Sequence, residues 1–135
     1  MHAPLLAVLV SIAAMTLPGC TTGASTAPAQ ASAPIGVAIP MSPGQRIALP
    51  DGATLRYLEV AADSRCPPGV QCIRAGDADV VFEFADAGQG PPRRLTVNTD
   101  PPATATIGQW QLRVQALAFG ESPVVTVRID RAAAP

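Results

Sequence analysis

A chain of 135 residues has room for one folded domain at most. Its cationic side chains are nine arginines, which ten carboxylates outnumber, so the formal net charge is −1 at pH 7. Because there is no basic excess, the chain lacks the electrostatic attraction that nucleic-acid binding needs, and we expect no nucleic-acid partner.

The first segment in chain order has the pattern of an export signal. Residues 5–15 form an apolar run that is too short to span a bilayer and ends near small residues. The sequence LPGC, which ends at Cys20, resembles the signal of bacterial lipoproteins, in which Leu lies three residues before a cysteine that receives lipid. The resemblance implies that residues 1–19 are removed and that Cys20 is lipidated. A plain secretory signal and a buried core helix are the alternatives.

The cysteine count supports lipidation of Cys20. The chain has three cysteines, and an odd cysteine in an oxidising compartment needs an explanation. If Cys20 carries lipid, Cys66 and Cys72 remain as an even pair that can form a disulfide.

Residues 20–34 read CTTGASTAPAQASAP and contain no charged and no large apolar side chain. Such a segment buries too little surface to offset the entropy of ordering it. We therefore expect a flexible tether that holds a domain off a membrane. The domain itself is expected over residues 35–131, with a short tail over residues 132–135.

Alternation of apolar and polar side chains predicts strands throughout this domain. The pattern is clearest in residues 77–86, 109–117 and 124–130. One apolar and one polar face are typical of an antiparallel sheet that covers a core on one side. Turn sequences rich in Pro and Gly separate these strands from four others, expected at residues 35–40, 45–49, 54–61 and 93–99.

About seven short strands predict an all-β fold, either a small antiparallel sandwich or a barrel. The sequence GESP is expected to close a hairpin between residues 109–118 and 124–130. The phase of alternation also predicts burial, because a slip of one residue would invert every assignment. The predicted core residues are Phe82, Phe84, Trp110, Leu112, Val114, Val125, Val127 and Ile129, and the predicted exposed residues are Asp79, Glu83, Arg113 and Arg128.

Cys66 and Cys72 enclose five residues, PPGVQ. A zinc site needs about four ligands, and the only histidine, His2, lies inside the signal, so we expect no metal. A redox motif is usually Cys-x-x-Cys, which this spacing is not. A structural disulfide is the remaining interpretation. By lowering the entropy of the unfolded chain, a disulfide that closes so short a loop should stabilise the domain by about 2.4 kcal/mol.

The cysteine pair belongs to a longer motif. Residues 63–76 read DSRCPPGVQCIRAG, which resembles a motif of a functionally uncharacterised family of small bacterial secreted proteins and lipoproteins. The resemblance implies a β-rich domain behind an export signal and implies no activity. The chain departs from the family at Arg74, where Trp is usual.

The chemistry of the motif residues favours an architectural role. Asp63 and Ser64 can accept hydrogen bonds from nearby backbone N–H groups where the strand ends. Gly76 is expected to supply a backbone conformation that a Cβ would obstruct. Pro67 stiffens the loop, and Arg65 can pair with a neighbouring acid. The acids within its reach are Asp63, Asp77 and Asp79.

Catalysis and cofactor binding are not expected. With no histidine after the signal, neither a Ser-His nor a Cys-His pair is available. Asp77, Asp79 and Glu83 alternate onto one strand face, where paired carboxylates or a calcium site would be the chemical alternatives. A solvated strand face explains these acids more simply.

Two classes of function remain. The first is a monomeric, membrane-tethered, non-catalytic module that binds an envelope protein or a small ligand with its loops. The second is a protease inhibitor that presents the Cys66–Cys72 loop, with Arg65 or Arg74 as its specificity residue. The resemblance to lipoprotein signals also implies a location, since a non-acidic residue such as Thr21 directly after the cysteine favours the outer membrane, facing the periplasm or the cell surface. Secretion into the periplasm is the alternative location.

Overall fold

The computed structural model describes residues 32–134, so the predicted signal and Cys20 lie outside the described residues. All regular structure in this range is β, and no helix in it is long and apolar enough to span a membrane. The strands are β1 (Ala38–Met41), β2 (Arg46–Ala48), β3 (Thr54–Asp63), β4 (Ala78–Asp86), β5 (Gln89–Asn98), β6 (Thr104–Ile107), β7 (Trp110–Leu117) and β8 (Val125–Arg131).

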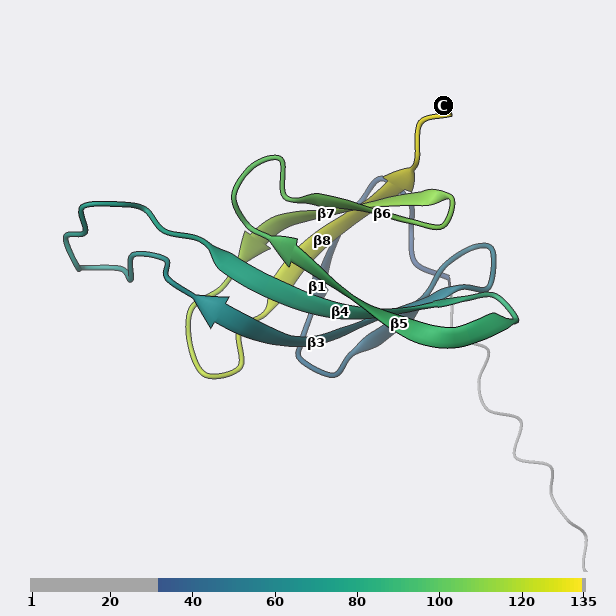
Figure 1. Ribbon diagram of the computed structural model, residues 1–135, viewed down its shortest axis with the longest axis horizontal. Helices are drawn as coiled ribbons and strands as arrows, with labels where there is room; N and C mark the ends of the chain where they lie inside the picture. Colours follow the sequence, from purple (N-terminus) through teal and green to yellow (C-terminus); the bar gives the residue numbers. More distant parts are fainter. Residues whose placement is uncertain (1–31, 135) are drawn as a thin grey trace, which may run out of the picture.

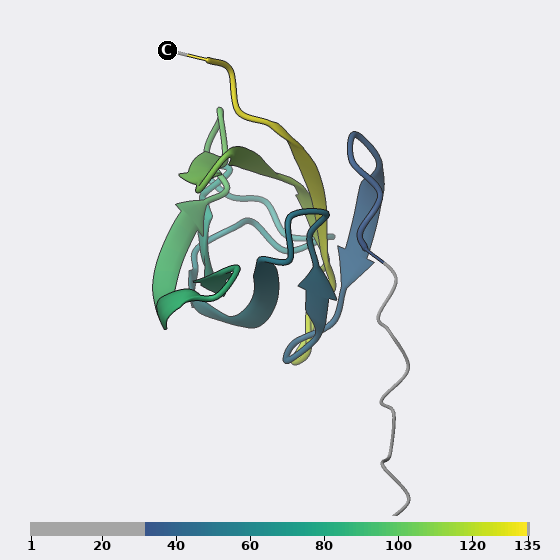
Figure 2. The same ribbon diagram turned by 90° about the vertical axis from the view of Figure 1, so that its right-hand side faces the viewer.

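The strands form two antiparallel sheets of four strands each, in the orders β1-β8-β7-β6 and β2-β3-β4-β5 (Figure 1). Figure 2 shows the same strands turned by 90° about the vertical axis. The prediction of an all-β fold is confirmed, and the fold is a small sandwich. The predicted hairpin is β7–β8, in which Leu117 faces Val125 beside the turn.

The core lies between the sheets and follows the predicted phase of alternation. All eight predicted core side chains are buried, with exposed fractions of 7% or less. Tyr57 of β3 is buried beside them, and its hydroxyl donates a hydrogen bond of 2.9 Å to the carbonyl oxygen of Pro123. This bond joins the middle of one sheet to the β7–β8 turn of the other.

The predicted exposure of the outer faces is only partly correct. Arg113 is exposed, but Asp79, Glu83 and Arg128 are half-buried. Each of these three side chains has a polar neighbour. The Asn98 side-chain amide donates to Asp79 at 2.8 Å, Arg46 lies 3.9 Å from Glu83, and the Arg128 guanidinium donates to the Asp130 carboxylate.

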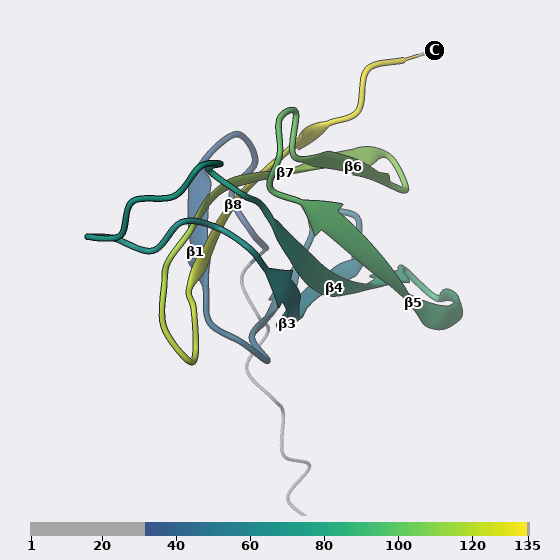
Figure 3. The same ribbon diagram turned by 60° about the vertical axis from the view of Figure 1, so that its left-hand side comes forward.

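The chain enters the sandwich at the end opposite the Cys66–Cys72 loop. Ala33 is buried, and its N–H donates to the carbonyl oxygen of Ala48 at 2.7 Å, beside the β2–β3 turn. The β3–β4 loop projects from the far end of the molecule (Figures 1 and 3). We call that end, with its β3–β4, β5–β6 and β7–β8 loops, the loop end.

Candidate functional site

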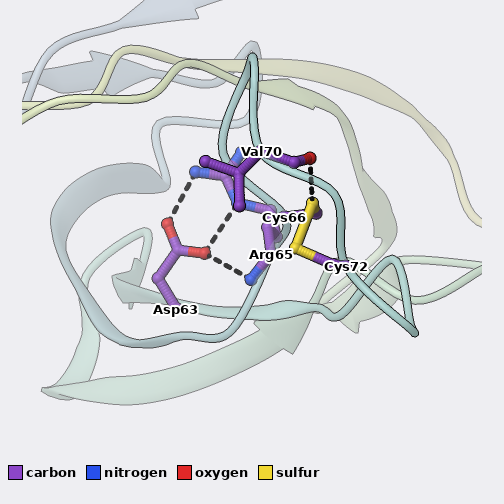
Figure 4. Close-up of a disulfide and its surroundings, with 5 residues drawn as sticks. All are labelled: Asp63, Arg65, Cys66, Val70 and Cys72. Atoms are coloured by element: carbon purple, nitrogen blue, oxygen red, sulfur yellow. Dashed lines mark hydrogen bonds and ion pairs between the residues drawn. A yellow bond between two sulfur atoms is a disulfide. The ribbon is translucent and has the colours of Figure 1, made fainter.

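The base of the β3–β4 loop continues the antiparallel pairing of its two strands. The N–H of Ser64 donates to the carbonyl oxygen of Asp77, and the N–H of Cys66 donates to that of Ala75, each at 2.8 Å. Beyond this base, Cys66 and Cys72 form a disulfide with their Cα atoms 5.8 Å apart (Figure 4). The predicted Cys66–Cys72 disulfide is confirmed, and it closes the tip of an extended hairpin.

The tip of the loop is a tight turn. The N–H of Val70 donates to the carbonyl oxygen of Pro67 at 3.2 Å, and Gly69 has a φ of 79°, which favours glycine. The Sγ atom of Cys66 lies 3.1 Å from the carbonyl oxygen of Val70 (Figure 4). Two large apolar side chains of this loop are exposed: Val70 is 56% exposed and Ile73 is fully exposed.

The motif residues have the backbone roles that their chemistry predicts. Asp63 Oδ1 accepts a hydrogen bond from the N–H of Arg65 at 3.0 Å, and Ser64 Oγ accepts one from the N–H of Asp77 at 3.1 Å. Gly76 has a φ of 68° and lies against the carbonyl of Ser64, where a Cβ would collide with it. These contacts define the strand exit at β3 and the strand entry at β4.

Arg65 fastens the β3–β4 loop to the β7–β8 loop. Its guanidinium group binds the Asp63 carboxylate with both Nε (2.9 Å) and Nη2 (2.7 Å) (Figure 4). It also donates to the carbonyl oxygens of Leu117 and Ala118, and its Cζ lies 4.1 Å from the ring centroid of Phe119. The Arg65 side chain is only 13% exposed as a result. We call this group of contacts the Arg65 clasp.

The clasp has an electrostatic consequence for Asp63. The hydrogen bonds and charge of Arg65 outweigh partial burial and hold the pKa of the Asp63 carboxyl below its usual value. Of the three acids that the sequence placed within reach of Arg65, Asp63 is the partner. Phe119 and the two carbonyls were not foreseen, because more than fifty residues separate them from Arg65 and no local pattern marks them.

The acids Asp77, Asp79 and Glu83, one before β4 and two within it, each have a different partner. Asp77 accepts a hydrogen bond from the Ser64 hydroxyl at 3.2 Å, Asp79 pairs with Asn98, and Glu83 lies 3.9 Å from Arg46. Within residues 32–134, no group of three or more His, Cys, Asp or Glu side chains is placed to hold a metal ion.

Two open hollows flank the clasp. One, of about 380 Å³, is lined by Arg65, Gly76, Phe119 and neighbouring residues of β7. The other, of about 400 Å³, is lined by Tyr57, Asp63 and residues of the β7–β8 loop. The loop end therefore combines exposed apolar side chains with concave surfaces at the base of the β3–β4 loop.

Comparison of the chain with protein-family models, with curated proteins and with solved structures finds no match. The family resemblance of residues 63–76 therefore rests on the motif alone.

Proposed function

We propose that the chain is a lipid-anchored protein of the bacterial cell envelope whose sandwich is a non-catalytic binding module. The observation that carries this proposal is the position of the chain entry relative to the loop. Ala33 enters beside the β2–β3 turn, and the disulfide-closed loop lies at the opposite end (Figure 1). A tether that runs from a lipidated Cys20 to this entry would hold the loop end away from the membrane surface.

The loop end is the binding face of this proposal. Ile73 and Val70 are exposed apolar side chains on a loop that the disulfide closes and that the Arg65 clasp ties to the β7–β8 loop. A preordered loop loses little conformational entropy when it binds, so more of its contact energy appears as affinity. Function in sandwich proteins is commonly carried by such loops on a rigid scaffold.

Protease inhibition is the weaker alternative. The guanidinium of Arg65 is occupied within the domain, so only Arg74 is left as an exposed specificity residue. Residues 67–70 form a closed turn, whereas a segment that mimics a protease substrate is extended. Titration of a trypsin-like protease tests this alternative, and absence of inhibition at micromolar protein would remove it.

The anchoring part of the proposal predicts that lipid is attached at Cys20. Cells grown with a fatty-acid analogue should label the wild-type protein, which should partition into the detergent phase. Cys20→Ala should abolish the label and the partitioning, because Cys20 is the cysteine directly after the predicted signal, at the position where lipid would be attached. The variant should keep the Cys66–Cys72 disulfide as a check on folding. Unchanged membrane association of an unlabelled variant would contradict the tether.

The binding part predicts that partner capture depends on Ile73. Ile73→Asp should reduce cross-linking to an envelope partner by about tenfold or more, because a charge would have to be buried in an apolar contact. Val37→Asp is the matched control, since Val37 is 50% exposed near the chain entry. Equal cross-linking by the two variants would show that the tip is not the contact surface.

A further inference from the structure

Two arginines face each other on the outer surface of the β1-β8-β7-β6 sheet. Arg113 of β7 and Arg128 of β8 are direct partners across the strand pair. Like charges at such positions destabilise a sheet. The next positions in the same row are Ala38 on β1 and Thr104 on β6, and neither supplies an acid.

The other sheet contains a similar arginine pair, but there both arginines have partners within the domain. Arg46 and Arg56 are direct partners, and Glu83 is next in their row. Arg46 lies 3.9 Å from Glu83, and Arg56 Nε donates to the carbonyl oxygen of Gly44 at 3.2 Å. The two arginines of this row therefore interact with groups of the domain itself and need no external anion.

Arg113 has no such compensation. Asp130 directs both carboxylate oxygens at Arg128 Nε, at 3.1 and 2.9 Å. No carboxylate among residues 32–134 lies within 4.0 Å of the Arg113 guanidinium. The positive charge of Arg113 therefore lies beside a second arginine, Arg128, with no carboxylate of its own.

A hollow lies at this pair and is framed by a β-bulge. Arg113, Gln115, Arg128 and Asp130 line a space of about 250 Å³. The β7–β8 register passes from Val114 opposite Val127 to Ala116 opposite Thr126, so Gln115 is an extra residue in β7. A bulge re-aims a side chain and is frequent beside binding sites. Gln115 also lines the hollow, and its side-chain amide is able to donate a hydrogen bond.

We propose that this hollow binds a singly charged oxyanion group, a carboxylate or a phosphodiester. Two guanidinium groups against one carboxylate leave one positive charge in the hollow. The planar arginine fork donates parallel N–H bonds to either kind of oxyanion. A bound oxyanion would also relieve the repulsion between Arg113 and Arg128. The site involves neither the lipid anchor nor the loop end, so it stands independently of the function proposed above.

The test follows the arginine Nε–H signals of the ¹⁵N-labelled full chain by NMR. Dimethyl phosphate and sodium acetate are titrated separately at pH 7, against sodium chloride at equal ionic strength. The Arg113 signal is expected to shift saturably with at least one oxyanion and not with chloride. Whichever of dimethyl phosphate and acetate binds with the lower dissociation constant shows whether the hollow prefers a phosphodiester or a carboxylate.

Three variants make the result specific. Arg113→Gln should weaken the oxyanion affinity about tenfold or more, through loss of a charge-assisted pair, without lowering stability, because the repulsion disappears too. Asp130→Asn should strengthen it, because a competing carboxylate is removed. Arg94→Gln, an exposed arginine on the other sheet, should leave it unchanged. Non-saturating shifts, or equal effects of the Arg113 and Arg94 substitutions, would overturn the proposal and leave only charge screening.

Discussion

Replacement of Trp110 by alanine is expected to lower the free energy of unfolding by about 3–5 kcal/mol. The ring is 1% exposed and lies in the core between the sheets. Its Nε1–H donates to Asp51 Oδ2 at 2.8 Å, and the Arg131 guanidinium lies 4.9 Å from its ring centroid. The substitution would leave a cavity and remove both contacts. Because the sequence has one tryptophan, unfolding in urea should be followed by circular dichroism rather than by fluorescence.

The control for this prediction removes a neighbouring hydrogen bond to Asp51 and leaves the Trp110 ring in place. Gln109 is exposed and donates to the same Asp51 oxygen at 2.9 Å. Gln109→Ala should therefore cost less than about 1 kcal/mol. A loss below about 1 kcal/mol for Trp110→Ala would contradict burial of the ring and would suit a surface binding residue instead.

The hydrogen bonds of Asp51 also make the stability of the domain depend on pH. Burial raises the pKa of the Asp51 carboxyl, but hydrogen bonds from Gln109, the Ala53 N–H and Trp110 outweigh it, so the pKa is below its usual value. Because the folded-state pKa is depressed, the ionised Asp51 carboxylate stabilises the fold at pH values above the unfolded-state pKa. This stabilisation is lost as the pH falls through the folded-state pKa. The Trp110 comparison should therefore be made near neutral pH.

Most of the fold could be predicted because each strand carries its own alternating pattern. The exception is β6, whose sequence TATI has one large apolar residue, Ile107, and only small residues elsewhere. Its strand character comes from pairing with β7 across a turn that starts at Gly108, whose φ is 59°. A partner strand, rather than local composition, determines this element.

The candidate site was predictable where its contacts are local. The disulfide, the Asp63–Arg65 pair and the backbone role of Gly76 all lie within fourteen residues of one another. The contacts of Arg65 with Phe119 and the β7–β8 carbonyls depend on how two sheets meet, which no local pattern encodes. The same applies to Arg113, since the hairpin was predictable but the bulge at Gln115 was not.

Gly76→Ala is expected to destabilise the domain by about 3 kcal/mol or more, because two costs combine. At a φ of 68° a side chain is strained, and the new Cβ would collide with the carbonyl group of Ser64 and lie 3.0 Å from the Arg65 Cα. Both neighbours are backbone atoms of the β3–β4 base, so they cannot move without breaking the Ser64–Asp77 pairing. Urea unfolding measures the loss.

Gly69→Ala is the matched control, because it carries the strain without the collision. Gly69 has a φ of 79°, close to that of Gly76, but nothing lies within 4 Å of a Cβ placed there. Its cost should be about 1–2 kcal/mol, the strain alone. Amide exchange at Ser64 and Cys66 should accelerate in Gly76→Ala and stay slow in Gly69→Ala, since only the first opens the base of the loop. If the two variants unfold at the same urea concentration and exchange alike, the close approach of Gly76 to Ser64 does not hold the loop, and the disulfide and the Arg65 clasp must position it without this contact.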